Sequence, residues 1–252
     1  MVMRKIAFVN QKGGVGKTTS AVNIGAGLTR LKKKVLMIDL DPQANLTYSL
    51  GFEADDARSN IYDYLKGISS YADVVQEKDG YKAITSHISL AGADLEFSVA
   101  PGREMILQER IGEDVDDIDY LLIDCPPSLG LLTLNALCAA IEVFIPIQTE
   151  YLALQGVKQL MDTVDKVQKR VNPHLQITGV IATRYDGRKL LNREVVDILK
   201  DQFKESLFKT VIRENISLAE APSWGKTIYD YRPKSYGADD YMKLCKEIIG
   251  RR

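Results

Sequence analysis

The sequence predicts an α/β fold in which a single domain, residues 1–252, has a mostly parallel central sheet with helices on both faces. Three observations support this fold class. Short apolar runs alternate with segments of helical periodicity, which is typical of β-α-β units. A glycine-rich turn joins the first apolar run to the first helical segment, and two later apolar runs end in aspartates. The chain is 45% hydrophobic over 252 residues, which is enough for one sizeable core.

The first strand, turn and helix have the composition of a phosphate-binding loop (P-loop). An apolar run predicts a strand at 4–9, and apolar residues at helical spacing predict a helix near 17–32. Between them, residues 11–18 read Gln-Lys-Gly-Gly-Val-Gly-Lys-Thr. Glycines let backbone N–H groups surround an anion, a lysine neutralises phosphates, and a threonine hydroxyl can reach Mg²⁺. The predicted nucleotide-binding residues of this loop are Lys12, Gly13, Gly14, Val15, Gly16, Lys17, Thr18 and Thr19.

The loop departs from the usual G-x-x-x-x-G-K-[ST] pattern in an informative way. Gln11 stands where the first glycine is usual, and Lys12 adds a second lysine next to it. Two lysines beside three glycines bring more positive charge to the phosphates than one loop normally needs.

The next two predicted strands carry acidic residues at their ends. The run at 35–39 leads to Asp39 and Asp41, which the strand period of two places on one face before Pro42 ends the strand. The run at 119–124 ends in Asp124, which is well placed to orient Mg²⁺ or its water. Ligands of open α/β sheets bind outside the carboxyl ends of the strands, so we expect all three aspartates to face the same crevice as the P-loop.

The remaining elements follow from the same alternation of patterns. Further strands are predicted at 142–147, 176–182 and 207–212, and two short ones at 84–90 and 95–100. Further helices are predicted near 61–66, 130–140, 154–171, 188–204 and 237–249.

Composition excludes several classes of protein. No apolar stretch approaches the roughly 20 residues of a membrane span, and the start of the chain has no secretory apolar segment, so we expect a cytoplasmic protein. The three cysteines, Cys125, Cys138 and Cys245, are widely spaced without a C-x-x-C pair, which indicates reduced and mostly buried thiols.

Three segments together resemble the ParA/Soj chromosome- and plasmid-partitioning ATPases, which belong to the MinD/ParA group of P-loop proteins with a deviant Walker A motif. These segments are the lysine-rich loop 12–18, the Asp-Leu-Asp-Pro-Gln element 39–43 and the Ile-Asp-Cys-Pro-Pro element 123–127. A fourth segment, 218–223, resembles a late ParA signature and favours ParA over its relatives.

The resemblance implies an ATPase that uses ATP and Mg²⁺. Lys12 would reach across a dimer to the partner's phosphates, and Lys17 would bind the β- and γ-phosphates in its own subunit. Asp41 would orient or deprotonate the attacking water, so that Lys12, Lys17 and Asp41 are the expected catalytic residues.

Magnesium would be held by residues of the loop and of the strand ends. The resemblance implies that Thr18 contacts the ion directly, and that Asp39, Asp41 and Asp124 contact it through water.

The resemblance also implies partners. An ATP-bound homodimer would bind nucleoid DNA without sequence specificity and work with a ParB/Spo0J-type protein that stimulates slow hydrolysis. The net charge of −1 predicts no strong nucleic-acid affinity by itself. However, residues 1–181 carry 18 basic and 23 acidic side chains, whereas residues 182–252 carry 15 and 11. Candidate DNA-binding residues in this basic part are Arg184, Arg188, Lys189, Arg193 and Arg213.

One segment departs from the family pattern. Relatives commonly read Pro-Arg-Asn-Val-Arg where residues 213–217 read Arg-Glu-Asn-Ile-Ser. An arginine used for DNA in relatives is therefore Ser217, and a basic residue stands at Arg213, which is a candidate for both nucleotide and DNA binding. Asn215 is kept and is expected to contact the adenine.

Two alternatives remain open at this point. A MinD-like membrane-associated ATPase needs a basic amphipathic helix after the fold. Residues 246–252 fall at the end of the last predicted helix, so no membrane partner is expected. The other alternative is a ParA-like ATPase that positions a protein cargo.

Overall fold

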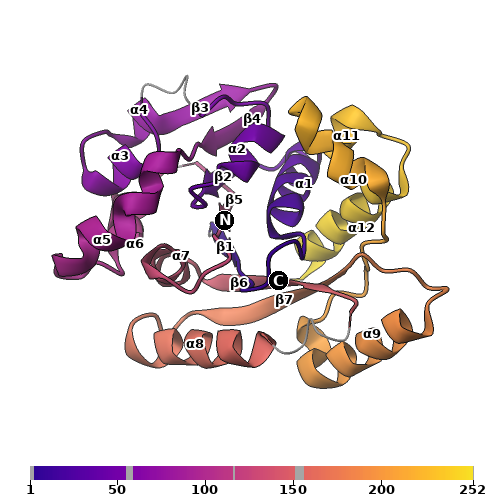
Figure 1. Cartoon of the computed structure of the whole chain (residues 1–252). Helices are drawn as coiled ribbons and strands as arrows, with labels where there is room; N and C mark the ends of the chain where they lie inside the picture. Colours follow the sequence, from indigo (N-terminus) through magenta and orange to yellow (C-terminus); the bar gives the residue numbers. More distant parts are fainter. Residues whose placement is uncertain (1–2, 55–58, 116, 151–155, 252) are drawn as a thin grey trace.

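A computed structural model describes residues 3–54, 59–115, 117–150 and 156–251 (Figure 1). Within these residues, seven strands form one sheet in the order β3-β4-β2-β5-β1-β6-β7, in which only β3 and β4 are antiparallel. The strands are β1 Arg4–Phe8, β2 Val35–Asp39, β3 Val75–Lys78, β4 Tyr81–Ile84, β5 Tyr120–Asp124, β6 Glu142–Gln148 and β7 Gln176–Thr183. The predicted fold class, a mostly parallel sheet, is confirmed.

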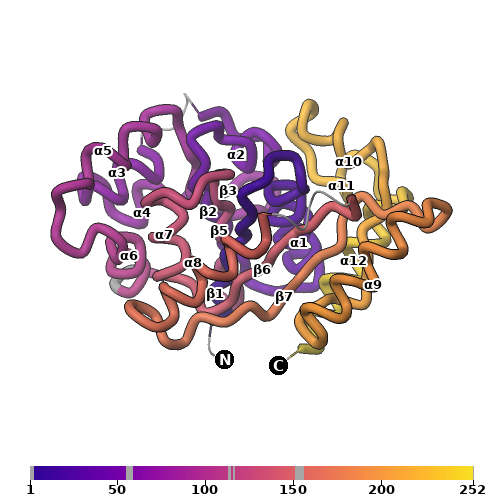
Figure 2. The backbone as a smooth tube through the Cα atoms, turned by 60° about the horizontal axis from the view of Figure 1, so that its bottom comes forward, coloured from indigo at the N-terminus to yellow at the C-terminus, as the bar shows by residue number. Residues whose placement is uncertain are grey.

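Helices cover both faces of the sheet (Figures 1 and 2). The α-helices are α1 Lys17–Arg30, α2 Asn45–Ser49, α3 Ile61–Lys66, α4 Tyr71–Val74, α5 Ala93–Glu96, α6 Ile106–Asp114, α7 Leu131–Ala139, α8 Val157–Arg170, α9 Leu190–Phe203, α10 Ile216–Glu220, α11 Ile228–Tyr231 and α12 Tyr236–Gly250. Short 3₁₀ helices are η1 Ile88–Gly92, η2 Phe97–Val99, η4 Lys204–Ser206 and η5 Ala221–Trp224. The helices predicted from periodicity are all present, although residues 154–155 of one prediction lie outside the described residues.

Side chains of the central strands alternate between two hydrophobic cores, one on each face. In β1, Ile6 and Phe8 pack with α1 and α12, whereas Ala7 packs with α7 and α8. The same alternation in β2 and β5 explains why these strands read as continuous apolar runs, because a parallel sheet is buried on both faces. Residues Asp39 and Asp124 stand at matching register positions at the ends of β2 and β5.

The predicted strand at 207–212 is wrong. This segment runs beside β7 and its amides at Phe208 and Ile212 donate to β7 carbonyls, but only isolated bridges form, Leu207 with Val180 and Arg213 with Tyr185 just past β7. Between the bridges, the backbone amides of Lys209 and Thr210 donate to the carboxylate of Glu247 at 2.8 and 3.0 Å. Because a side chain takes the donors that a ladder would need, the segment does not become a regular strand.

The two strands predicted at 84–90 and 95–100 are also wrong. The sheet edge is instead a hairpin of β3 and β4, whose turn residues Asp79 and Gly80 both have positive φ, 53° and 81°. After β4 the chain turns at His87, whose ring accepts from the amide of Ser89, and continues as η1, α5 and η2.

The three cysteines are free and buried, as predicted. Burial raises the pKa of the Cys138 thiol to about 11 and that of Cys245 to about 12, and it raises the pKa of Cys125 well above its usual value. None of the helices in the described part of the chain has the length and apolar character to span a bilayer.

Candidate nucleotide-binding site

The glycine-rich loop lies between β1 and α1 and is fixed from both sides. Asn10 donates to the carbonyl of Pro146 at 2.8 Å and accepts from the amide of Lys12 at 3.0 Å. Gly14 and Gly16 have φ of 73° and 92°, a conformation that side chains with a Cβ rarely adopt. The loop thus turns its backbone into the first turn of α1, where unpaired N–H groups favour an anion.

The two lysines of the loop have different surroundings. Lys17 is the buried first residue of α1, and its Nζ lies 3.4 Å from the carbonyl oxygen of Lys12. Burial lowers the pKa of Lys17, against the opposite effect of the Asp124, Cys125 and Asp41 side chains. Lys12 is half-exposed, with Nζ 3.6 Å from Oε2 of Glu150. One lysine therefore points into the site, and the other lies at its surface.

Asp39 holds the turn that follows β2. Its Oδ1 accepts from the amide of Asp41 at 3.1 Å, and its Oδ2 accepts from the amide and hydroxyl of Thr47 at 2.9 and 2.8 Å. The side chain is completely buried, and burial raises its pKa to about 6 although these hydrogen bonds lower it. Both oxygens of Asp39 are thus already occupied by the chain itself.

Asp41 lies beyond the end of β2, in the turn that Asp39 holds. Its Oδ1 accepts from the amide of Gln43 at 3.0 Å. Within the described residues, no hydrogen bond is formed by its other carboxylate oxygen. Asp41 is buried with only 7% of its surface exposed, so that one carboxylate oxygen is held in a fixed position and available to a ligand.

Asp124, in contrast, is completely buried and neither of its carboxylate oxygens has a hydrogen-bond partner among the described residues. Burial, and then the charge of Asp39, raise the pKa of Asp124 well above its usual value. The Thr18 hydroxyl and the Lys17 ammonium lie close enough to offset part of this rise. An unpartnered buried carboxylate beside a P-loop is a group that a cation or its water would satisfy.

This contrast gives a testable prediction for stability. Replacing Asp124 by asparagine should raise the free energy of unfolding of the nucleotide-free protein, because the amide stays neutral where burial and Asp39 disfavour the ionised carboxylate. At pH 8 the gain should be about 1–3 kcal/mol and near pH 3 it should vanish, because a raised pKa destabilises the folded state only where the unfolded carboxyl is ionised. Urea unfolding followed by circular dichroism measures it.

The matched control is Asp39→Asn, on the neighbouring strand in the same register. The asparagine NH₂ would face groups that donate to Asp39, so this variant should lose stability by a similar amount. Equal losses in both variants would show that Asp124 is as well satisfied as Asp39.

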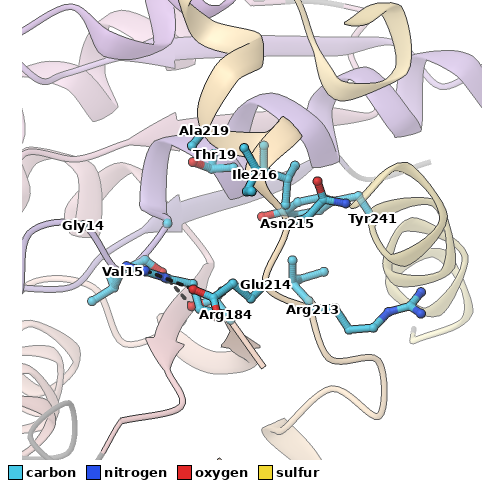
Figure 3. A pocket seen from close by; sticks show the side chains of 14 residues that line it. Gly14, Val15, Thr19, Arg184, Arg213, Glu214, Asn215, Ile216, Ala219 and Tyr241 are labelled. Carbon is cyan, nitrogen blue, oxygen red and sulfur yellow. Dashed lines mark hydrogen bonds and ion pairs between the residues drawn. The ribbon is translucent and has the colours of Figure 1, made fainter. Parts of the chain in front are cut away.

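A pocket of about 350 Å³ opens beside the loop (Figure 3). It brings together six residues predicted to bind nucleotide: Gly14, Val15, Gly16, Thr19, Arg213 and Asn215. The side-chain oxygen of Asn215, Oδ1, caps α10 by accepting from the amide of Ser217 at 2.8 Å. The side-chain NH₂ of Asn215 makes no hydrogen bond within the described residues. The pocket therefore offers one amide donor above a mostly apolar wall.

Arg213 is among the residues that line the pocket, but its side chain points away from the loop toward α12 (Figure 3). Its guanidinium contacts Asp240 at 2.5 Å and lies over the ring of Tyr236, 4.3 Å from the centroid. The carboxylate of Asp240 is only 5% exposed, so this ion pair ties the segment before α10 to α12.

The structure also adds residues that the sequence patterns missed. Thr183, Glu214 and Tyr241 line the pocket, and Thr183 donates to the carbonyl of Val15 at 2.8 Å. Thr183 is the last residue of β7. A polar residue at the end of an apolar run is the pattern that identifies Asp39 and Asp124, and the same pattern could have identified Thr183.

The candidate DNA-binding residues lie near the β7–α9 corner, and most are paired. Arg188 contacts Asp186 at 2.9 Å. Arg184 and Lys189 both contact Glu214, each at 3.3 Å. No ion pair involves Arg193 among the residues that the structure describes.

A P-loop between β1 and α1, with carboxylates at the ends of the neighbouring strands β2 and β5, defines a P-loop nucleoside triphosphatase. Comparison with known proteins narrows this class. Residues 3–177 match the family described as "AAA domain". The "Sporulation initiation inhibitor protein Soj" of Bacillus subtilis (strain 168) is 45% identical over 245 residues, 96% of this chain and 97% of that protein.

Two further matches agree. The "Chromosome-partitioning ATPase Soj" of Treponema pallidum (strain Nichols) is 45% identical over 251 residues, 98% of each chain. The structure of cobyrinic acid a,c-diamide synthase from Mycobacterium smegmatis with a bound ATP analogue and magnesium has a TM-score of 0.87 and 36% identity, covering 98% of this chain and 95% of that one. The present chain belongs to the Soj/ParA family of chromosome-partitioning ATPases and is an ATPase.

Proposed function

We propose that this ATPase forms an ATP-bound homodimer that binds DNA without sequence specificity and drives partitioning with a ParB-type protein. The observation that carries the proposal is the difference in burial between the two lysines of the P-loop. Lys17 is buried against the carboxylates of its own site, whereas Lys12 lies half-exposed beside Glu150. Because the loop has one lysine for its own phosphates, the second is available to the nucleotide of a partner subunit.

In this proposal the residues of the site act mainly by positioning and charge neutralisation. The loop amides and Lys17 hold the phosphates of ATP, and Asn215 donates to the adenine. Asp41 orients the attacking water through its free carboxylate oxygen and accepts a proton from it. Since hydrolysis depends on the position of one carboxylate in a turn, a partner protein that changes this turn can control the rate.

The residues present also fit a magnesium ion. The unpartnered carboxylate of Asp124 and the nearby Thr18 hydroxyl are oxygen donors, the type that this ion prefers. Thr18 would hold the ion directly, and Asp124 and Asp41 would hold its water shell. The bound ion supplies positive charge that neutralises the phosphate oxygens. Asp39 would contribute mainly by fixing the Asp41 turn, because both of its oxygens accept from the chain.

DNA binding tests the proposed function directly. Binding of a duplex of arbitrary sequence should require ATP, because only a dimer places two basic surfaces side by side. With about four phosphates contacted, the affinity should fall by about 10²-fold between 50 and 200 mM salt. Surface-resonance titrations in ATP, in ADP and without nucleotide measure both effects.

Charge reversal at Arg188 and Lys189 should weaken this binding and leave nucleotide binding unchanged. A matched control reverses Lys166 and Arg170 on α8, two exposed cations in the part of the chain before residue 182. Sequence-specific binding, or equal binding in ADP and ATP, would contradict the proposal and leave an ATPase with another cargo.

A further inference from the structure

Glu214 stands between the basic corner and the nucleotide pocket. Its two carboxylate oxygens pair with different cations, Oε1 with Arg184 and Oε2 with Lys189, each at 3.3 Å. All three side chains are about half-exposed, at 45%, 54% and 56% respectively. One carboxylate thus neutralises two of the cations proposed to contact DNA.

The backbone fixes this arrangement. The amide of Tyr185 donates to the carbonyl of Ile212, and the amide of Glu214 donates to the carbonyl of Tyr185, both at 3.0 Å. This bridge holds Glu214 next to the end of β7, where Arg184 stands. The backbone hydrogen bonds therefore bring Glu214 and Arg184 close together, whichever rotamers their side chains adopt.

The neighbouring cations have their own partners. Arg188 is bound by Asp186, and Arg213 is bound by Asp240 and Asp239. No other carboxylate of the described residues forms an ion pair with Arg184 or Lys189. Within the described residues, Glu214 is hence the carboxylate that forms ion pairs with both of these cations.

Glu214 and Arg184 also line the pocket that Gly14, Val15 and Gly16 border (Figure 3). An anionic ligand in this pocket attracts Arg184 and repels Glu214, so it competes with the ion pair. Exposed ion pairs are weak enough for such a competitor to break. Loss of the Arg184 contact leaves Lys189 as the one remaining ion-pair partner of Glu214 among the described residues.

We propose that Glu214 is an autoinhibitory contact, which masks Lys189 from nucleic-acid phosphates until a nucleotide in the adjoining pocket attracts Arg184 and repels Glu214. The inference rests on the proposed function, since it names how nucleotide would control the DNA-binding surface. It makes Glu214 a link between two sites that share no ligand.

The test compares Glu214→Gln with Glu194→Gln. Glu194 is exposed on α9, forms no ion pair in the described part of the chain, and its replacement removes the same single charge. Nucleotide-free protein is eluted from immobilised heparin, a polyanion, with a salt gradient. Glu214→Gln should elute at clearly higher salt than the wild type, and Glu194→Gln should show only the small shift of one lost charge.

Duplex DNA then measures the coupling to nucleotide. Without nucleotide, Glu214→Gln should bind DNA about three- to tenfold more tightly than the wild type, so the gain on adding ATP should shrink by that factor. Equal heparin elution of the two variants would overturn the inference. A wild type that ignores DNA in ATP would contradict the proposed function instead, and heparin elution would still decide the role of Glu214.

Discussion

Replacement of Asp41 by alanine is expected to slow ATP hydrolysis by about 10²- to 10⁴-fold, the usual contribution of a positioned acid or base. The reason is geometric, because Asp41 presents one carboxylate oxygen that no group of the described chain uses. The P-loop and Lys17 remain, so nucleotide should still bind and the ATP-bound dimer should accumulate. Single-turnover phosphate release, with DNA binding measured in parallel, gives both results.

Asp41→Asn is the matched control for the shape of the turn. Its carbonyl oxygen can still accept from the amide of Gln43, but it cannot take a proton from water. Both variants should therefore be slow and both should retain DNA binding. If the alanine variant hydrolyses ATP at the normal rate, the catalytic role of Asp41 is wrong. If only the alanine variant is slow, Asp41 acts through the turn.

Replacement of Lys12 by alanine should leave nucleotide binding to the monomer largely intact and abolish ATP-dependent dimerisation. Truncating one partner of a buried charge pair at an interface costs about 2–5 kcal/mol, which weakens the dimer at least about 30-fold. Size-exclusion chromatography with light scattering, in ATP and at micromolar protein, separates monomer from dimer.

Glu150→Gln supplies the control for this experiment. Glu150 is the ion-pair partner of Lys12 in the structure, at 3.6 Å. If Lys12 mattered only through that pair, both variants would behave alike. The trans contact instead predicts that Glu150→Gln still dimerises. A normal ATP-dependent dimer from Lys12→Ala would falsify the trans role.

The parts of the fold that the sequence predicts well share one physical cause. Buried parallel strands need apolar residues on both faces, so β1, β2, β5 and β6 appear as short apolar runs with sharp ends. The site lies at those ends, which is why residue patterns alone are enough to place the loop and its aspartates. The helices α8 and α9 carry the apolar spacing that marks one buried face, whereas α1 is buried almost all round from residue 20 to 28.

The errors come mostly from contacts that local patterns do not contain. Glu247 lies 37 residues from Thr210, yet its carboxylate takes the amide that would have extended the sheet. The hairpin of β3 and β4 is different, because local sequence does contain its turn signal, Asp79-Gly80. The strands predicted at 84–90 and 95–100 rest on apolar residues further along the chain. The pairing of Glu214 with Arg184 links residues 30 apart and is likewise beyond the reach of periodicity.

The three buried cysteines have a practical consequence for following this protein in motion. A maleimide dye reacts with the thiolate form of an accessible thiol, and burial suppresses both conditions at Cys125, Cys138 and Cys245. A single cysteine introduced at an exposed position such as Val99, which is 88% exposed, would therefore carry essentially all of the label. The chain can then carry one dye without removal of its own thiols, so that single-molecule fluorescence can measure whether and for how long individual molecules stay on a DNA-coated surface.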